Sequence, residues 1–327
     1  MRKKGLALLA VAGSLAFGVA ACGDDDDDGT ASGSTTEQSS DGGDISGSIA
    51  IDGSSTVAPF AEAAAELFNE EYPDVKITVG TSGTGGGFEK FCAGETDIST
   101  ASRPIDEEEE VPVCEQGGVK YTEIVVANDG IAVATNKDLA VDCMTVEQLK
   151  QLWNKGSQVT KLSEIDPSFP DTELSLYGPG TDSGTFDFFT DQINGEEGVS
   201  REDYEASEDD NQLVTGVSGD QGGFGYFGFS YYEAAADSLN LVGVDSGDGN
   251  CVKPSVETIQ DGSYKPLSRP LFVYPKADAV TRPEVKAFLD YTVENAAAIA
   301  EAAKIVPLTE EQVGTAKEEL ATAESGS

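Results

Sequence analysis

The stretch ISGSIAIDGSSTVAPFAEAAAELFNEEYPDVKITV, residues 45–79, indicates the fold of this chain. It begins with a strand-like run that ends in the small, polar residues 53–56, and it closes on residues 75–79, which alternate as a strand does. Between these strands, apolar residues recur along 57–72 at the spacing of one helix face. The stretch therefore predicts a strand, a loop rich in Ser and Thr, a helix and a second strand.

The same order of elements returns further along the chain. The glycine-rich segment 81–87 follows the strand at 75–79 and opens into a helical pattern. A strand-like segment, 174–177, leads to another Gly, Ser and Thr loop at 178–185, after which a helical pattern resumes at Phe186. Strands that alternate with helices in this way predict an α/β chain.

Three of these loops place Gly, Ser and Thr at the start of a predicted helix, at 53–56, 81–87 and 182–185. The first N–H groups of a helix lack partners and lie at the positive end of its dipole, so they favour an anion. Ligands of open α/β sheets bind at the carboxyl ends of strands, where these loops fall. Ser and Thr are also ordinary N-caps, so one such loop would carry little weight. Three together predict a site for a small oxyanion, with phosphate as the first candidate.

The N-terminal segment predicts export and a lipid anchor. Basic residues 2–4 precede an apolar stretch, 6–16, which has the length of a signal peptide rather than of a membrane span. The segment 1–21 ends in a box that resembles the bacterial lipoprotein cleavage site, so we expect Cys22 to be lipidated and to anchor the mature protein outside the cell membrane. Ordinary cleavage beside an incidental cysteine is the alternative. Residues 22–46 contain almost nothing apolar, which predicts a disordered tether.

Composition excludes several classes of function. The formal net charge is −40, so nucleic acid is not expected as a partner. An anionic ligand is still compatible, because diffuse charge is screened over about 8 Å, whereas N–H donors act at hydrogen-bond distance. The chain has no histidine, which removes a Ser-His-Asp triad, and no Gly-Lys-Ser/Thr follows the glycines as in a P-loop. We expect neither an enzyme nor a cofactor; a hydrolase with Ser183 as nucleophile is the alternative.

The cysteines are consistent with an oxidising compartment. With Cys22 assigned to the lipid, four remain, and three pairings are open. We favour Cys92–Cys114, which closes a short loop, together with Cys143–Cys251, which lies within one middle segment. A zinc site is the rival interpretation, but the chain has no Cys-x-x-Cys motif, so no metal is expected.

Six segments, which follow one another in the same order along the chain, resemble the PstS/SphX branch of the phosphate-binding lipoproteins of bacterial ABC importers. They are residues 53–59, 83–88, 97–104, 178–189, 207–211 and 266–272. The resemblance covers nearly the whole mature chain and implies a type II periplasmic-binding-protein fold, in which two α/β lobes flank a ligand cleft. Lobe 1 would comprise 47–127 plus 272–327 and lobe 2 would comprise 128–271, with the crossings at 124–127 and 271–274.

The resemblance also implies which residues contact phosphate. They are Ser55, Thr56, Thr84, Ser183, Gly184 and Thr185. This sequence has Arg103 where the better-studied branch has an aspartate, and Pro179 where it has an arginine. We therefore expect Arg103 to supply a guanidinium fork to the phosphate. A salt bridge between the lobes is the alternative role for Arg103.

A carboxylate in the site would favour phosphate over sulfate. Phosphate carries a proton near neutral pH and can donate it to a buried carboxylate, whereas sulfate cannot. The candidates are Asp97, Asp182, Asp209 and Asp210, of which we expect Asp182 and Asp210 to lie nearest to the loops.

The family implies a role in transport. A monomeric, lipid-anchored protein would capture inorganic phosphate between its lobes, and hinge closure would be read by an ABC permease that is driven by its ATPase subunit. Two alternatives stay open: a binding protein for another tetrahedral oxyanion, or a phosphate sensor without a transport role.

Overall fold

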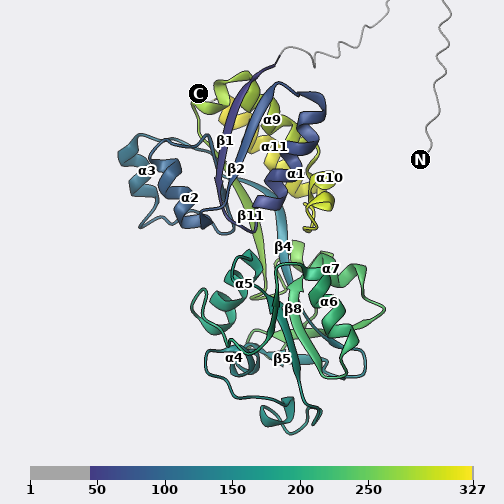
Figure 1. The fold of residues 1–327 in the computed structure, drawn as a ribbon. Helices are drawn as coiled ribbons and strands as arrows, with labels where there is room; N and C mark the ends of the chain where they lie inside the picture. The colour runs from purple at the N-terminus through teal and green to yellow at the C-terminus, as the bar shows by residue number, and fades with distance from the viewer. Residues whose placement is uncertain (1–44, 326–327) are drawn as a thin grey trace, which may run out of the picture. The chain divides into compact units, whose positions relative to one another are not determined.

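The computed structural model describes residues 45–325, and Figure 1 shows how their elements are arranged. The predicted signal segment, Cys22 and nearly all of the predicted tether lie outside the described residues. Every described residue belongs to a single compact unit. No helix within 45–325 is long and apolar enough to cross a membrane.

The first strand–helix–strand unit forms as the sequence predicts. Strands β1 (Gly47–Gly53) and β2 (Val75–Gly80) pair in parallel, and helix α1 (Ala58–Glu71) connects them. A proline in the first turn suits the start of α1, because its missing N–H has no partner there in any case. The apolar face of α1 is buried, with Phe60 and Phe68 fully covered.

The second unit continues the same sheet. Helix α2 (Gly83–Cys92) leads to β3 (Ile98–Ala101), which pairs in parallel with β1. Helix α3 (Val111–Gly117) follows, and the disulfide Cys92–Cys114 joins it to α2.

Two long strands complete this sheet and continue beyond it. Strand β11 (Ser268–Pro275) pairs antiparallel with β3 and with β4 (Ile124–Asn136), so the strand order is β2-β1-β3-β11-β4. We call this sheet with its helices lobe 1. Its C-terminal helices are α9 (Pro283–Glu294), α10 (Ala296–Ala302) and α11 (Glu310–Ser325).

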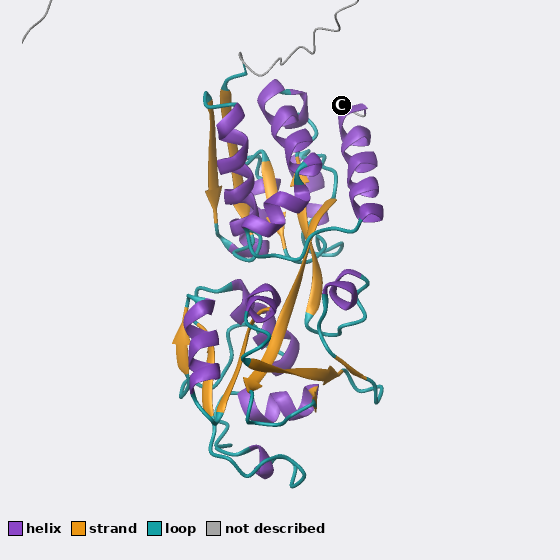
Figure 2. Cartoon of the chain, turned by 90° about the vertical axis from the view of Figure 1, so that its right-hand side faces the viewer, coloured by secondary structure: helices purple, strands orange, loops and turns teal. Residues whose placement is uncertain are grey.

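Lobe 2 is built on the second half of β4. Its further strands are β5 (Cys143–Thr145), β6 (Ser175–Pro179), β7 (Glu205–Ser207), β8 (Gly223–Gly228), β9 (Leu239–Asp245) and β10 (Cys251–Val252). From Ile131 onward β4 pairs with β8 and β9 instead of β11, and β8 continues the sheet through β6 to β7. Its helices are α4 (Val146–Trp153), α5 (Gly184–Phe189), α6 (Asp210–Gly219), α7 (Phe229–Ala234) and α8 (Val256–Gln260), and one π-helical turn, Thr190–Asn194, follows α5. Figure 2 shows the helices of both lobes packed along their strands.

Each lobe has its own apolar core. The large cluster of lobe 1 includes Ala127 and Leu271, whereas that of lobe 2 includes Ile131 and Leu267. The change from one core to the other therefore falls on β4 and at the start of β11, where Figure 1 shows both strands running between the lobes. The two-lobed α/β fold is as predicted, while the residue bounds given for each lobe stay a prediction.

The second disulfide, Cys143–Cys251, joins β5 to β10 inside lobe 2. Together with Cys92–Cys114 it reproduces the favoured pairing, and each bridge stays within one lobe. Neither disulfide therefore restricts movement of one lobe against the other.

Candidate functional site

A cavity of about 790 Å³ lies between the lobes, and all three Gly, Ser and Thr loops reach it. Lobe 1 contributes residues 54–56, 82–86 and 102–104, whereas α5 of lobe 2 contributes Gly184, Asp187 and Phe188. Loops that are far apart in the sequence therefore converge on one hollow, as an anion site built from several helix starts requires.

The first loop supplies unpaired donors to this cavity. The backbone of Ser54 is held in place, because its N–H donates to Thr100 O at 2.9 Å and its carbonyl accepts from Val57 N. The N–H groups of Ser55 and Thr56 donate no hydrogen bond to any residue within 45–325, and both residues line the cavity. Two backbone N–H groups and two hydroxyls thus converge at the start of α1.

The second loop forms the start of α2. Thr84 lines the cavity, and its hydroxyl accepts a hydrogen bond from Ser102 N at 3.2 Å. Since Gly83 is the first residue of the helix, the N–H groups of Gly83, Thr84 and Gly85 have no carbonyl partner within it. This loop therefore offers the positive end of a helix dipole.

The third loop reaches the cavity through one of its three predicted residues. Gly184 lines the cavity, but Ser183 and Thr185 do not. The Ser183 hydroxyl instead caps α5 by accepting from Thr185 N at 3.2 Å. A Cβ on Gly184 would lie 2.1 Å from the Thr56 hydroxyl, so only glycine lets the first and third loops approach this closely.

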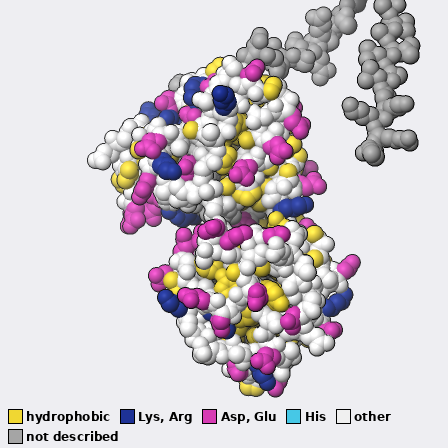
Figure 3. Space-filling model, in the orientation of Figure 1, with side chains coloured by type: hydrophobic (Ala, Val, Ile, Leu, Met, Phe, Trp, Pro, Cys, Tyr) yellow, Lys and Arg dark blue, Asp and Glu magenta, His cyan; other side chains and the backbone are white. Residues whose placement is uncertain are grey.

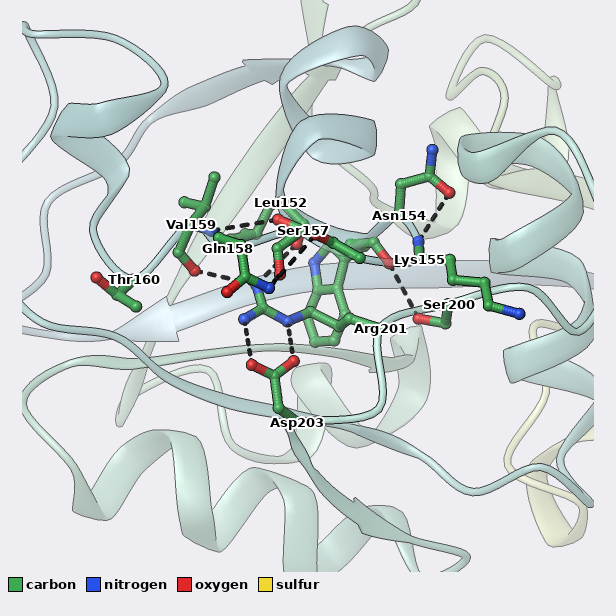
Figure 4. Close-up of polar contacts among 12 residues, drawn as sticks. Leu152, Asn154, Lys155, Ser157, Gln158, Val159, Thr160, Ser200, Arg201 and Asp203 are labelled. Carbon is green, nitrogen blue, oxygen red and sulfur yellow. Dashed lines mark hydrogen bonds and ion pairs between the residues drawn. The ribbon is translucent and has the colours of Figure 1, made fainter.

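Aromatic and charged residues of lobe 2 fix the position of the third loop. In Figure 4, the guanidinium of Arg201 donates to both carboxylate oxygens of Asp203 and to the carbonyls of Leu152 and Val159. The Arg201 side chain is only 4% exposed, and its contacts hold the segment after residue 200 against the end of α4.

The nearby Tyr204 connects this part of lobe 2 to the third loop. Its ring packs edge-on against Trp153 at 5.6 Å, and its hydroxyl donates to Pro179 O at 2.9 Å. One carboxylate oxygen of Glu208 accepts from Asp182 N at 3.3 Å. The segment 179–182 is thus fixed before α5 begins.

Arg269 on β11 is a cation on the wall of the cavity, and the sequence patterns assigned it no role. One guanidinium nitrogen donates to the Thr56 hydroxyl at 2.8 Å and to Gly184 O at 3.2 Å, so it touches both lobes. Another nitrogen donates to Asp129 at 3.2 Å, and the guanidinium stacks 3.8 Å from the ring centre of Phe188. Burial lowers the pKa of Arg269, and Asp129 opposes that shift. An arginine stays protonated under these conditions, so Arg269 carries a fixed positive charge, with Asp129 as its partner.

Arg103 also reaches the cavity, but its charge is already matched. Its guanidinium donates to both carboxylate oxygens of Glu110 at 2.7 and 2.8 Å, and the side chain is 47% exposed. Hydrogen bonding to Glu110 raises the pKa of Arg103. Because Glu110 belongs to the same lobe, the lobe–lobe salt bridge considered for Arg103 does not form.

The four carboxylates proposed as proton acceptors do not line the cavity. Asp97 accepts from Ala50 N and pairs with Arg282, so it braces its strand. Asp209 caps α6, and Asp182 is exposed. Asp210 accepts from the N–H of Gly228 at 3.3 Å, and burial raises its pKa to about 6. Neither Asp182 nor Asp210 is among the residues that line the cavity, and their role as proton acceptors stays a prediction.

Three other carboxylates line the lobe 2 wall of the cavity: Asp187, Asp191 and Glu197. Burial raises the pKa of Asp187 to about 6, Glu197 acts in the same direction, and Arg269 acts against it. The sequence patterns gave no sign of Asp187, which lies two residues after the Ser-Gly-Thr motif.

The donors of this site suit an anion. Within residues 45–325 no group of three or more His, Cys, Asp or Glu side chains is arranged to hold a metal ion. Acidic side chains are spread over both lobes on the face seen in Figure 3, whereas N–H groups, hydroxyls and Arg269 lie inside the cavity. Hydrogen bonds to an ionised group are roughly twice as strong as neutral ones, so these short-range donors outweigh the screened surface charge.

Fold and site together define a two-lobed substrate-binding protein with an anion site between its lobes. A family model described as a PBP superfamily domain matches residues 30–296. SphX of Synechocystis sp. is 46% identical over 274 residues, 83% of this chain and 81% of that protein, and SphX of Synechococcus elongatus is 43% identical over 262 residues, 80% and 77%. The phosphate-binding protein PstS of Staphylococcus saprophyticus is 41% identical over 237 residues, 72% of each.

Solved structures agree with this assignment. A crystal structure of a possible phosphate binding protein from Planctomyces limnophilus has a TM-score of 0.80 and 42% identity, covering 86% of this chain and all of that one. An ABC-type phosphate transport receptor from Vibrio cholerae shares the fold at a TM-score of 0.61 and 21% identity, covering 80% of this chain and all of that one. The chain belongs to the PBP superfamily, in the branch of the SphX and PstS phosphate-binding proteins.

Proposed function

We propose that this chain is the substrate-binding protein of a phosphate ABC importer, which captures inorganic phosphate between its lobes and delivers it to the permease. The observation that carries the proposal is the convergence of three helix-start loops and Arg269 on one cavity. The names of its SphX and PstS relatives support phosphate as the ligand. The protein is a binding protein rather than an enzyme.

The proposed contacts follow from the geometry of the cavity. Ser55 and Thr56 would bind phosphate through N–H and hydroxyl groups, Thr84 through the start of α2, and Gly184 through its backbone N–H. Arg269 would supply the fixed cation. Each hydrogen bond to a charged group contributes about 1.5–3 kcal/mol. Four or five of them are sufficient for tight binding of one small ion.

We assign Ser183, Thr185 and Arg103 roles other than direct contact with phosphate. Ser183 and Thr185 shape the start of α5 through their mutual hydrogen bond. Arg103 lies at the cavity with Glu110 as its partner and contributes to the local field. Only the backbone of the third loop would touch the ligand.

Lobe movement would couple binding to transport. Phosphate would bridge groups of both lobes around Arg269, and β4 and β11 provide the hinge. The closed form is then the state that a permease distinguishes from the open one, and the ATPase subunit supplies the energy. A lipid anchor at Cys22 would keep a monomer outside the cell membrane; the basic, apolar and Cys pattern of the N-terminus supports this part of the proposal.

Calorimetry tests the binding step directly. The exported chain carrying Cys22→Ser is titrated with phosphate, arsenate, molybdate and sulfate at pH 7.5. We expect a single site with phosphate bound at least tenfold more tightly than sulfate. Absence of binding heat and of any thermal shift with phosphate would contradict the proposal, and tighter binding of molybdate would favour another tetrahedral oxyanion.

Uptake of labelled phosphate by cells separates transport from sensing. Deletion of the gene should lower uptake at low external phosphate, and the full-length protein should restore it. Unchanged uptake, with an altered response to phosphate starvation, would instead favour a sensor.

A further inference from the structure

Asp52 is a partly buried carboxylate at the end of β1 that does not line the cavity but contacts the second loop. One of its oxygens accepts from Ser82 N at 3.0 Å and from the Ser82 hydroxyl. The other oxygen pairs with Lys90 Nζ at 2.7 Å. Gly80, the residue opposite Asp52 on β2, leaves the space for this carboxylate, because a Cβ there would lie 2.4 Å from an Asp52 oxygen.

The start of α2 differs from that of α5, although a serine is the N-cap of both helices. The Ser183 hydroxyl accepts from Thr185 N, two residues into α5, as an N-cap serine ordinarily does. The side chain of Ser82 accepts no such hydrogen bond from α2. Its hydroxyl donates to Asp52 instead. The first N–H groups of α2, those of residues 83–85, are therefore left for a ligand.

The sequence of α2 gives its own first turn little support. Residues 83–87 are Gly-Thr-Gly-Gly-Gly, and glycine is among the residues that favour a helix least. The first turn contains no acidic residue, which would stabilise the positive end of the helix dipole. At Gly87 the glycine is required by packing, since a Cβ there would lie 2.5 Å from Gly53 Cα. The carboxylate of Asp52 supplies from β1 the support that this helix lacks.

We propose that Asp52 is a positioning residue for ligand binding, which holds Ser82 so that the N–H groups of residues 83–85 stay presented to the cavity. The inference rests on the proposed function, because it assumes that the cavity binds phosphate. Asp52 acts through Ser82 and the start of α2, and it does not line the cavity itself.

The charge of Asp52 makes the expected sign of its effect informative. Burial raises the pKa of Asp52, but hydrogen bonds from Lys90 and Ser82 outweigh burial, so the pKa lies below its ordinary value and the group is ionised at neutral pH. By charge alone, removal of an anion close to an anion site would tighten phosphate binding. The positioning role predicts weaker binding, because a released Ser82 hydroxyl can cap α2 and compete with phosphate for its N–H groups.

Calorimetry with phosphate at pH 7.5, in the Cys22→Ser chain, tests this sign. In Asp52→Ala we expect the phosphate affinity to fall at least tenfold. Asp52→Asn keeps one oxygen that can accept from Ser82, so its loss of affinity should be smaller than that of Asp52→Ala.

Asp171→Ala is the matched control. Asp171 also accepts from a serine hydroxyl, that of Ser163 at 2.8 Å, and pairs with Lys161 at 3.2 Å, but it lies in lobe 2 and does not line the cavity. Its phosphate affinity should stay within threefold of the parent. A loss equal to that of Asp52→Ala would overturn the inference, because affinity would then follow the removal of any such carboxylate.

A double-mutant cycle with Ser82→Ala separates positioning from a general effect on stability. Without the Ser82 hydroxyl nothing is released to cap α2. The loss of phosphate affinity caused by Asp52→Ala should therefore be at least threefold smaller in the Ser82→Ala background than in the parent. A role in stability alone would give the same loss in both backgrounds.

The outcomes separate the inference from the proposed function. If the parent binds phosphate, but Asp52→Ala binds it as tightly or more tightly, or loses the same affinity with and without the Ser82 hydroxyl, the role of Asp52 is refuted and phosphate capture stands. If the parent binds no phosphate at all, both fail. Should Asp52→Ala not fold, as judged by circular dichroism, the same cycle with Asp52→Asn decides.

Discussion

The two walls of the cavity differ in chemistry although they face the same ligand. The lobe 1 wall consists of residues 54–56, 82–86 and 102–104, which apart from Arg103 and Pro104 are small and rich in N–H and hydroxyl donors. The lobe 2 wall presents Gly184, Phe188, Gln192 and three carboxylates. Lobe 1 therefore supplies most of the attraction, whereas lobe 2 closes the site and restricts what enters. Arg269 stands between them and contacts both.

The largest loss of phosphate affinity should come from substitution of Arg269, which contacts both walls. Arg269→Gln removes the buried cation and leaves Asp129 without its partner, and loss of one member of a buried charge pair costs about 2–5 kcal/mol. We expect the phosphate affinity to fall at least hundredfold, on the order of 3 kcal/mol, in calorimetry.

Arg103→Gln is the matched control for this variant. The Arg103 guanidinium is half-exposed and paired with Glu110, so its loss should weaken phosphate binding by less than tenfold. Equal losses in the two variants would mean that the two arginines share the role that we assign to Arg269.

The second largest loss of phosphate affinity should come from a substitution at Gly184, where the two walls approach each other closely. In Gly184→Ala the new Cβ would lie 2.1 Å from the Thr56 hydroxyl and 2.7 Å from Thr56 N, so the lobes would be held apart. We expect phosphate affinity to fall by ten- to a hundredfold, with less compaction on phosphate addition in small-angle X-ray scattering. Gly219→Ala is the control, because no atom lies within 4 Å of its Cβ, and both measurements should match the parent.

Asp210 should influence stability rather than selectivity. Its pKa is raised to about 6 in the folded chain from an ordinary 3.8, so the folded state binds the proton more tightly, and stability should decrease as pH rises from 4 to 6. Asp210→Asn removes this penalty, which is at most about 3 kcal/mol, and should raise Tm at pH 8 relative to the parent. A changed ratio of phosphate to sulfate affinity in this variant would instead support Asp210 as a proton acceptor.

The smallest effect is expected at Ser183, which caps α5 without lining the cavity. Ser183→Ala should cost about 1 kcal/mol of stability in urea unfolding. Its phosphate affinity should stay within threefold, because the ligand would meet the Gly184 backbone instead. A loss of affinity beyond tenfold would show that the Ser183 hydroxyl contacts phosphate directly, as the family resemblance implies.

Local patterns were sufficient for the first unit of the fold. The helix at 58–71 and its flanking strands followed from hydrophobic spacing, because each depends on residues close in sequence. The disulfides Cys92–Cys114 and Cys143–Cys251 were also predicted, from the even number of cysteines that remain after Cys22 and from the short loop that the first bridge closes. The roles of the site residues were harder to predict, because the sequence around a serine at a helix start looks the same whether the serine caps the helix or binds a ligand.

The sequence by itself determined the alternating α/β order, the three donor-rich loops and the family. Only the tertiary structure decided which cation and which carboxylates face the cavity. Arg269 meets Asp129 because β11 and β4 pair in a particular antiparallel register, and it meets Thr56 because the lobes approach at Gly184. Such contacts join residues up to 213 positions apart, and no local pattern encodes them, because they depend on how strands pair and how two lobes close.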